Sequence, residues 1–258
     1  MTTTKYISLL SAPGGVGKTT ISICLAWMLR EDAKSILLAD MDPSLGSTLR
    51  IFNTKDQIFR YKKDKEKKKR TTADLMKIVW DGIEGKEEKI ERLISNITFK
   101  DITFDFIPGS IRLEDSMSEI WYSTSGGHRE KYLKRGLTVL DDLNHYDHII
   151  VDTIPCYAFS YSIQSIFAGD LIIIPLRPTI TDLYRTLEMV EKLANTMNKY
   201  EVSKPDFYKK IHFVFNIVET RSKAEQLIKD GVYARELTNV CPGAYVFKNY
   251  IKKTLAFN

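Results

Sequence analysis

The chain has 258 residues, of which 43% are hydrophobic and 28% charged. This is the composition of an ordinary soluble globular protein, and the length fits one large α/β domain. No run of about 18 apolar residues occurs, so no membrane-spanning helix is expected, and the first residues lead directly into a predicted strand, which leaves no room for a signal peptide. The three cysteines lie far apart, which argues against a disulfide framework or a zinc site and favours a reducing cytoplasm. The net charge of +5 is mildly basic and does not by itself indicate nucleic-acid binding.

The first predicted element is an apolar strand, Tyr6 to Leu10, followed by Ser11-Ala-Pro-Gly-Gly-Val-Gly17 and a helix that begins at Lys18. The three glycines let this loop curl and turn several N–H groups inward, with the helix N-terminus behind them. The pattern predicts a P-loop, in which Lys18 faces the outer phosphates and the Thr19 hydroxyl is a Mg²⁺ ligand. The predicted nucleotide-binding residues of the loop are Pro13, Gly14, Gly15, Val16, Gly17, Lys18, Thr19 and Thr20.

Two acids follow the next predicted strand, Ser35 to Ala39, in the sequence Asp40-Met-Asp42-Pro43. Ligands collect at the carboxyl edge of a parallel sheet, so we expect both carboxylates to face Mg²⁺ and the γ-phosphate. The alternative is a helix cap and turn, since Asp-Pro is common in turns.

The segment 55–70 interrupts the apolar pattern. From Arg60 to Arg70, eight basic side chains outnumber Asp64 and Glu66. We expect a basic exposed insert here, a solvated loop or a frayed helix end. Two interpretations remain open for it: a solubilising charge run, or a contact to nucleic acid or an acidic partner. The residues proposed for that contact are Lys67, Lys68, Lys69 and Arg70.

Apolar periodicity predicts the remaining elements. Helices are expected over 19–30, 71–80, 86–95, 111–122, 130–143, 181–200 and 223–237, and strands over 102–107, 148–151, 170–175, 211–216 and 245–247. Residues 156–168 are expected to form a switch II segment and its helix. Asp152 directly follows the strand at 148–151, which is the design of a Walker B acid that supports the Mg²⁺ shell. The order of elements predicts a doubly wound, mainly parallel α/β sheet with helices on both faces.

Taken in order, these motifs resemble the ParA/MinD ATPases across nearly the whole chain. The loop resembles their deviant Walker A sequence Lys-Gly-Gly-x-Gly-Lys-Thr, with Pro13 in place of the first lysine, and Asp40 to Pro43 resembles their second signature. Gly46-Ser-Thr48 resembles the start of their switch I region. The resemblance implies a single ParA-like P-loop ATPase domain over 1–258, with ATP or ADP and Mg²⁺ as cofactors.

The resemblance also implies roles for individual residues. Lys18 binds the β- and γ-phosphates and Asp42 positions the attacking water, so these two are the expected catalytic residues. Asn216, at the end of the predicted strand 211–216, contacts adenine. The expected Mg²⁺ residues are Thr19, Asp40 and Asp152, partly through water.

Among ParA/MinD proteins, the accessory features favour a ParA-type partition ATPase. Such proteins form a homodimer with ATP, bind DNA without sequence preference and respond to a centromere-binding, ParB-like adaptor. Arg221, Lys252 and Lys253 are the DNA contacts expected by family position. Residues 245–247 and 250–256 resemble the family's closing strand and its helix start. The tail 250–258 has little apolar face, so no membrane partner is expected, and the expected localisation is cytoplasmic and nucleoid-associated.

Pro13 is the main departure from the family. The family's lysine at this position reaches across the dimer to the partner's phosphates, whereas proline has no charge and no N–H. We therefore expect ATP binding, and a Mg²⁺-dependent ATPase activity that is weak without this lysine. A non-catalytic or weakly catalytic regulatory relative is the first alternative. A MinD-like positioning ATPase and a biosynthetic P-loop ligase are the others.

Overall fold

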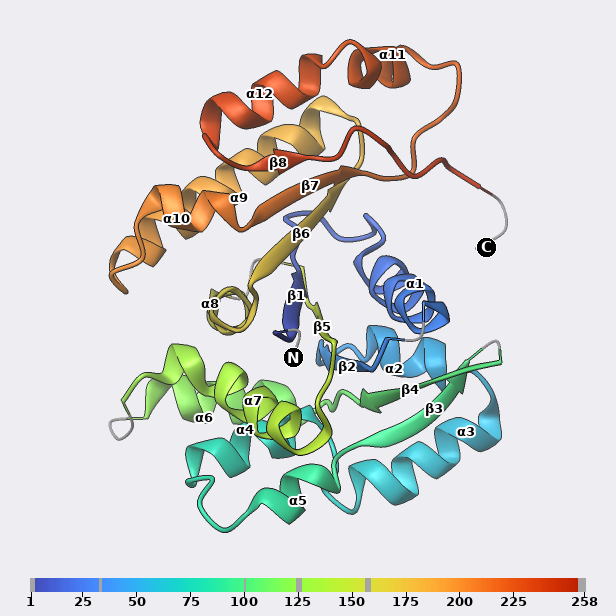
Figure 1. Ribbon diagram of the computed structural model, residues 1–258, viewed down its shortest axis with the longest axis vertical. Helices are drawn as coiled ribbons and strands as arrows, with labels where there is room; N and C mark the ends of the chain where they lie inside the picture. Colours follow the sequence, from blue (N-terminus) through green and yellow to red (C-terminus); the bar gives the residue numbers. More distant parts are fainter. Residues whose placement is uncertain (1–2, 33, 100, 124–126, 156–158, 255–258) are drawn as a thin grey trace. The chain divides into compact units, whose positions relative to one another are not determined.

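The computed structural model describes residues 3–32, 34–99, 101–123, 127–155 and 159–254, and Figure 1 shows their helices and strands. They form two compact units that alternate along the chain. The first unit contains the described residues of 1–8, 19–154 and 158–170, and the second contains those of 9–18, 155–157 and 171–258. The expectation of one ParA-like domain over 1–258 stays a prediction.

The first unit is built on five strands in the order β3-β4-β2-β5-β1. The parallel strands are β1 (Lys5–Leu9), β2 (Ile36–Met41), β4 (Ile102–Ile107) and β5 (His148–Thr153), and β3 (Ser95–Phe99) pairs antiparallel with β4. The helices are α1 (Lys18–Glu31), α2 (Gly46–Ile51), α3 (Lys55–Arg60), α4 (Thr72–Trp80), α5 (Glu87–Glu91), α6 (Leu113–Tyr122), α7 (Tyr132–Asn144) and α8 (Phe159–Ala168). A π-helix, η1 (Tyr61–Glu66), continues α3, and a 3₁₀ turn, η2 (Arg129–Lys131), precedes α7.

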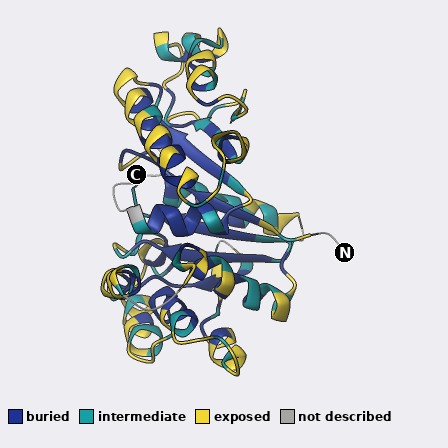
Figure 2. Ribbon diagram, turned by 90° about the vertical axis from the view of Figure 1, so that its left-hand side faces the viewer, coloured by how far each residue is buried: buried dark blue, intermediate teal, exposed yellow. Residues whose placement is uncertain are grey.

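The core of this unit lies where the sheet meets α4, α6 and α7. Leu37 of β2 and Val151 of β5 belong to one buried cluster with Met76, Met117 and Leu137 of these helices. Every residue of β2 is buried, as expected for a parallel strand covered on both faces. Figure 2 shows most of the strand residues in the colour of buried residues, whereas the helices carry exposed residues along their outer sides.

The second unit is built on three parallel strands, β6 (Leu171–Leu176), β7 (Ile211–Phe215) and β8 (Tyr245–Val246), in that order. Its helices are α9 (Ile180–Asn198), α10 (Lys204–Lys209), α11 (Lys223–Lys229) and α12 (Val232–Val240). The predicted α/β class with a mainly parallel sheet is thus confirmed.

The basic segment 55–70, expected as a solvated loop or a frayed helix end, is helical over residues 55–66. Thr54 and Gln57 form a capping box at the start of α3, each side chain accepting from the other residue's backbone N–H. Tyr61 is buried, its ring stacks on Phe52, and its hydroxyl donates to the Gly109 carbonyl at 2.8 Å. These tertiary contacts hold a helix that the local charge density alone would disfavour.

Other elements differ from their predicted bounds. The helix expected over 86–95 is the short α5, and the residues after it begin β3, an antiparallel edge strand that was not predicted. The helix expected over 223–237 is two helices, separated at Gly231, whose φ of +69° interrupts the helix. The described residues 250–254 contain an isolated β-bridge between Lys252 and Val218, and no helix begins in them. Residues 156–158 of the expected switch II lie outside the described residues.

Candidate functional site

The glycine-rich loop belongs to the second unit and is held by its own side chains. The Ser11 hydroxyl donates to the Pro13 carbonyl at 2.8 Å, and the Lys18 ammonium donates to the Ser11 oxygen at 2.8 Å. Lys18 is buried, so its charge is held inside the curl of the loop. Gly15 and Gly17 have φ values of +71° and +92°, which turn the backbone as the sequence predicts. The sequence placed Ser11 in this loop but did not indicate that its hydroxyl would link Lys18 to the Pro13 carbonyl.

Asn216, at the end of β7, fastens the same loop. Its Nδ2 donates to the Val16 carbonyl at 2.8 Å, and its Oδ1 accepts from the backbone N–H of Ile217 at 2.9 Å. A Cβ built on Gly17 would lie 2.3 Å from Nδ2 of Asn216, so only glycine fits there. The structure thus gives Asn216 a role in shaping the P-loop, which the sequence did not suggest, and its contact to adenine stays a prediction.

Asp40 and Asp152 lie side by side in the first unit. They are register partners on the adjacent parallel strands β2 and β5, so their side chains leave the same face of the sheet. Both are fully buried, and burial together with the neighbouring Asp152 raises the pKa of Asp40 to about 8. Two buried carboxylates on adjacent strands repel each other when both are ionised, so the pair favours either retention of a proton or binding of a cation.

The segment after β2 wraps around these acids. The Thr48 N–H and hydroxyl donate to Asp40 at 2.8 and 2.6 Å, and the Ser47 hydroxyl donates to Asp152 at 2.6 Å. The N–H of Asp42 donates to the second Asp40 oxygen at 3.1 Å. Asp40 therefore anchors residues 42–48 through three hydrogen bonds, and its role as a Mg²⁺ residue stays a prediction.

Thr19 and Asp42 flank Gly46 in the same unit. A Cβ built on Gly46 would lie 2.9 Å from Oγ1 of Thr19 and 3.6 Å from Oδ2 of Asp42, so the absence of a side chain leaves room between the two groups. The other Asp42 oxygen accepts from the Ser44 N–H at 2.7 Å, which fixes the carboxylate. The next residue of α1, Thr20, accepts a hydrogen bond from Arg50.

These donors suit a hard divalent cation. No group of three His, Cys, Asp or Glu side chains able to hold a metal ion occurs among the described residues. Mg²⁺ does not require one, since it commonly uses one or two carboxylates with phosphate oxygens and water. The hydroxyl of Thr19 and the carboxylates of Asp42 and Asp152 are oxygen ligands of that class, so the residues present fit Mg²⁺.

The predicted DNA-binding residues fall into two separate groups. Arg221, Lys252 and Lys253 belong to the second unit, where Lys253 pairs with Glu219 at 2.7 Å and Lys252 is exposed. Lys67, Lys68, Lys69 and Arg70 form the turn that follows η1 in the first unit. The last three line a concavity of about 330 Å³ together with Lys77, Lys89 and Arg92. The sequence pattern did not indicate that α4 and α5 add cations to this turn.

The same concavity contains one carboxylate, that of Asp74, which is already paired with Arg112. It accepts from both terminal nitrogens of Arg112, at 3.0 and 2.9 Å. Lys68 pairs with Asp64 at 3.0 Å. The surface therefore carries a net positive charge.

No helix of the described residues is long and apolar enough to cross a membrane.

Known proteins resemble this chain in sequence and in fold. Residues 4–209 match the family described as AAA domain. The sporulation initiation inhibitor protein Soj of Bacillus subtilis is 29% identical over 198 residues, covering 74% of this chain and 68% of Soj. A putative plasmid partition protein of Borrelia burgdorferi bound to AMPPNP has a TM-score of 0.65 at 22% identity, over 88% of this chain and 80% of that one.

The fold is shared with an enzyme of a different kind. Cobyrinic acid a,c-diamide synthase of Mycobacterium smegmatis, with bound ADP and magnesium, has a TM-score of 0.68 at 18% identity, over 98% of this chain and 88% of that one. Such structural likeness shows the fold and leaves the reaction to the site residues. With the AAA domain match over most of its length, the chain belongs to that family, as a P-loop ATPase of the ParA/MinD type.

Proposed function

We propose that the protein is a partition-type ATPase, which binds Mg²⁺ and ATP at its P-loop, dimerises with ATP and binds DNA without sequence preference. The observation that carries this proposal is the P-loop itself, in which Lys18 is buried and the backbone at Gly15 and Gly17 takes the turn that phosphate binding needs. The match to the AAA domain family supports the ATPase part of this proposal, and the partition role is suggested by the likeness in fold to a putative plasmid partition protein.

In this proposal each side chain has a defined task. Lys18 leaves the Ser11 hydroxyl and pairs with the β- and γ-phosphates, while the N–H groups of the loop hold the remaining phosphate oxygens. Asp42, fixed by the Ser44 N–H, orients a water molecule for attack on the γ-phosphorus. Mg²⁺, when bound, neutralises charge on the transferred phosphoryl group. Thr19 and Asp152 would hold it, and the first of these directly follows Lys18 in the chain.

Nucleotide binding and hydrolysis are tested separately. We expect the wild-type protein to bind a fluorescent ATP analogue in the presence of Mg²⁺, and Lys18→Ala to abolish this binding. Lys199→Ala, which changes an exposed lysine outside the loop, is the matched control and should bind normally. A Lys18→Ala protein that binds and hydrolyses ATP like the wild type would refute the assignment.

DNA binding rests on the exposed basic residues. Gel shifts on unrelated duplexes, with and without ATP, should show binding that weakens as salt rises. Neutralising Lys252 and Lys253 together should reduce the slope of log affinity against log salt by about 2, the value for two phosphate contacts. Retention of no duplex at low salt, in either nucleotide state, would remove DNA from the proposal. Partnership with a ParB-like adaptor and association with the nucleoid are parts of the same proposal.

A second candidate follows from Pro13. Its ring is buried and its carbonyl accepts from Ser11, so position 13 offers no cation to a second subunit. A nucleotide-dependent regulatory protein with little or no turnover would have this feature. Light scattering after size exclusion, in ADP and in a non-hydrolysable ATP analogue, tests dimer formation, and phosphate release with DNA tests turnover. A dimer with the analogue and no phosphate release would favour the regulatory candidate.

A further inference from the structure

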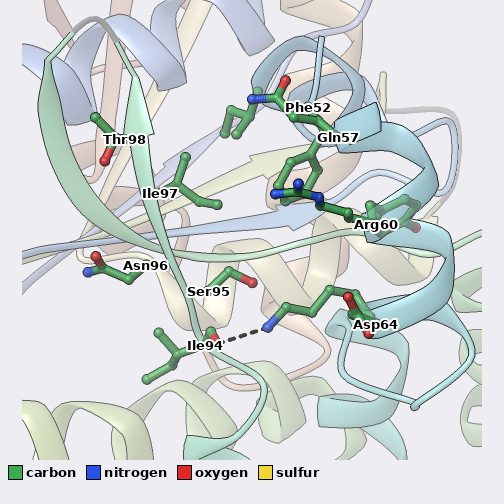
Figure 3. Close-up of a pocket in the computed structure, with 12 residues that line it drawn as sticks. Phe52, Gln57, Arg60, Asp64, Ile94, Ser95, Asn96, Ile97 and Thr98 are labelled. Carbon is green, nitrogen blue, oxygen red and sulfur yellow. Dashed lines mark hydrogen bonds between the residues drawn. The ribbon is translucent and has the colours of Figure 1, made fainter. Parts of the chain in front are cut away.

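A cavity of about 550 Å³ lies between the helical segment 55–66 and strand β3, in the first unit (Figure 3). This volume falls within the range of ligand pockets. One wall comes from the helical segment, and the other comes from the strand. The lining residues used below are Phe52, Arg60, Lys65, Ser95 and Ile97.

The cavity follows the outer edge of β3. Five consecutive residues, Ile94 to Thr98, line it. Successive side chains of a strand point to opposite faces, so a cavity that touches all five runs along the backbone edge and not over one face. β3 is the last strand of its sheet, and its only strand partner among the described residues is β4. The outer edge of a terminal strand offers N–H and C=O groups to an incoming strand.

A buried hydroxyl faces the cavity without a partner. Ser95 is 7% exposed, and its Oγ has no hydrogen-bond partner among the described residues. Figure 3 shows this hydroxyl directed from β3 toward the helical segment. An unsatisfied buried hydroxyl is unfavourable, and a bound polar group that pairs with it would remove this cost. This is the second, independent sign that the edge of β3 receives a ligand.

The cavity is positively charged and partly apolar. The Arg60 guanidinium extends from α3 toward the strand (Figure 3), and the Lys65 ammonium donates to the Ile94 carbonyl at 3.0 Å. The carboxylate of Asp64 in the same wall is paired with Lys68 at 3.0 Å. Phe52 and Ile97 supply apolar surface beside these cations. The complementary ligand is therefore extended, carries at least one carboxylate and has an apolar side chain.

We propose that this groove binds an acidic, extended peptide segment of a partner protein, which adds to the edge of β3 as a further strand. Main-chain hydrogen bonds to β3 give affinity, and an acidic side chain facing Arg60 gives selectivity. The five lining residues 94–98, four of them in β3, match a core recognition segment of about five residues. The site uses none of the nucleotide-binding residues, so it stands independently of the proposed function.

The test starts from a displayed library of random heptapeptides, selected on the immobilised full-length chain without nucleotide. We expect enrichment of sequences with an acidic residue among β-branched ones. Enriched peptides, synthesised with a fluorescein label, should bind in an anisotropy assay. On binding, they should slow hydrogen exchange at the amides of 94–98.

Three variants connect binding to the groove. Arg60→Glu should weaken peptide binding at least about tenfold, because it places like charge against the ligand. Lys62→Glu changes an exposed cation of the same helical segment outside the lining, and should weaken binding less than about twofold. Ser95→Ala should weaken binding several-fold without lowering the unfolding midpoint in urea, because the hydroxyl has no hydrogen-bond partner in the described part of the chain.

Each other outcome overturns the proposal. Failure of any sequence to enrich over uncoated matrix would do so, and so would peptides that bind Arg60→Glu as tightly as wild type. Protection of amides other than 94–98 would place the peptide elsewhere. Slowed exchange at these amides without peptide, at high protein concentration, would assign the edge to a second copy of this chain.

Discussion

The substitution Gly17→Ala tests how the P-loop is built. The Cβ it adds would lie 2.3 Å from Nδ2 of Asn216, a distance that real Cβ atoms do not adopt. Asn216 must therefore move, and its hydrogen bond to the Val16 carbonyl is lost. The backbone at position 17 also has a φ of +92°, which alanine adopts only with strain.

The expected cost has two parts. Loss of the hydrogen bond to a buried carbonyl costs about 1–3 kcal/mol, and the left-handed backbone costs about 1–2 kcal/mol. We therefore expect Gly17→Ala to lower the free energy of unfolding by about 2–5 kcal/mol and to abolish nucleotide binding. Gly15→Ala is the matched control, because its φ is +71° but, apart from its two chain neighbours, no described residue has an atom within 4 Å of the new Cβ. It should cost only the backbone strain, about 1–2 kcal/mol.

Urea unfolding followed by circular dichroism measures these differences. A second background, Asn216→Ala, isolates the clash: there the alanine at position 17 should cost at least about 1 kcal/mol less than in the wild type, since the amide it displaces is gone. Equal costs for Gly15→Ala and Gly17→Ala, or equal costs of Gly17→Ala in both backgrounds, would refute the role assigned to Asn216.

Three other predictions concern the framework around the site. Arg112→Met leaves Asp74 without its two guanidinium donors, and we expect the free energy of unfolding in urea to fall by about 2 kcal/mol; an unchanged midpoint would contradict this. Gly136→Ala adds a Cβ that would lie 2.8 Å from a side chain of α4, and this overpacking should lower the free energy of unfolding by about 1–3 kcal/mol. The melting temperature should fall accordingly, and an unchanged melting temperature would contradict the packing. Hydrogen bonds lower the pKa of Glu225 to about 2, and the largest contribution comes from Tyr250. The stability that the ionised Glu225 contributes is therefore fully present above its ordinary pKa and is lost as the pH falls toward 2. Tyr250→Phe should raise this pKa in a carboxyl NMR titration, and a Glu225 pKa that does not move would contradict the assignment.

The strand-end acids were predictable because their positions follow from local rules. A buried strand ending in an acid is readable from the sequence, and parallel strands bring their carboxyl ends to one edge. That Asp40 and Asp152 become register partners also follows from two such strands, once β2 and β5 are adjacent. The adjacency itself, and the hydrogen bonds from Ser47 and Thr48, depend on how the chain folds between them.

The role of Asn216 was not predictable, because it depends on a contact between residues 200 positions apart. The sequence shows a polar residue at a strand end, which is compatible with a ligand contact or a turn. Only the three-dimensional arrangement shows its amide against the Val16 carbonyl. The same holds for Gly17, since a glycine in this loop is expected for its φ but not for the space that Asn216 occupies.

The segment 55–66 shows why charge patterns alone mislead. Its apolar positions are too few for a helical period, yet the buried ring of Tyr61 and the Glu66 carboxylate tie it to the rest of the unit. Glu66 accepts from Arg112 at 2.9 Å, and the Tyr61 hydroxyl donates to Gly109, whose N–H donates to Thr48 at 2.8 Å. Because Thr48 in turn donates to Asp40, one chain of hydrogen bonds joins the helical segment 55–66, which forms one wall of the cavity beside β3, to Asp40. A segment that reads as a solvated insert is thus part of the framework that positions the acids.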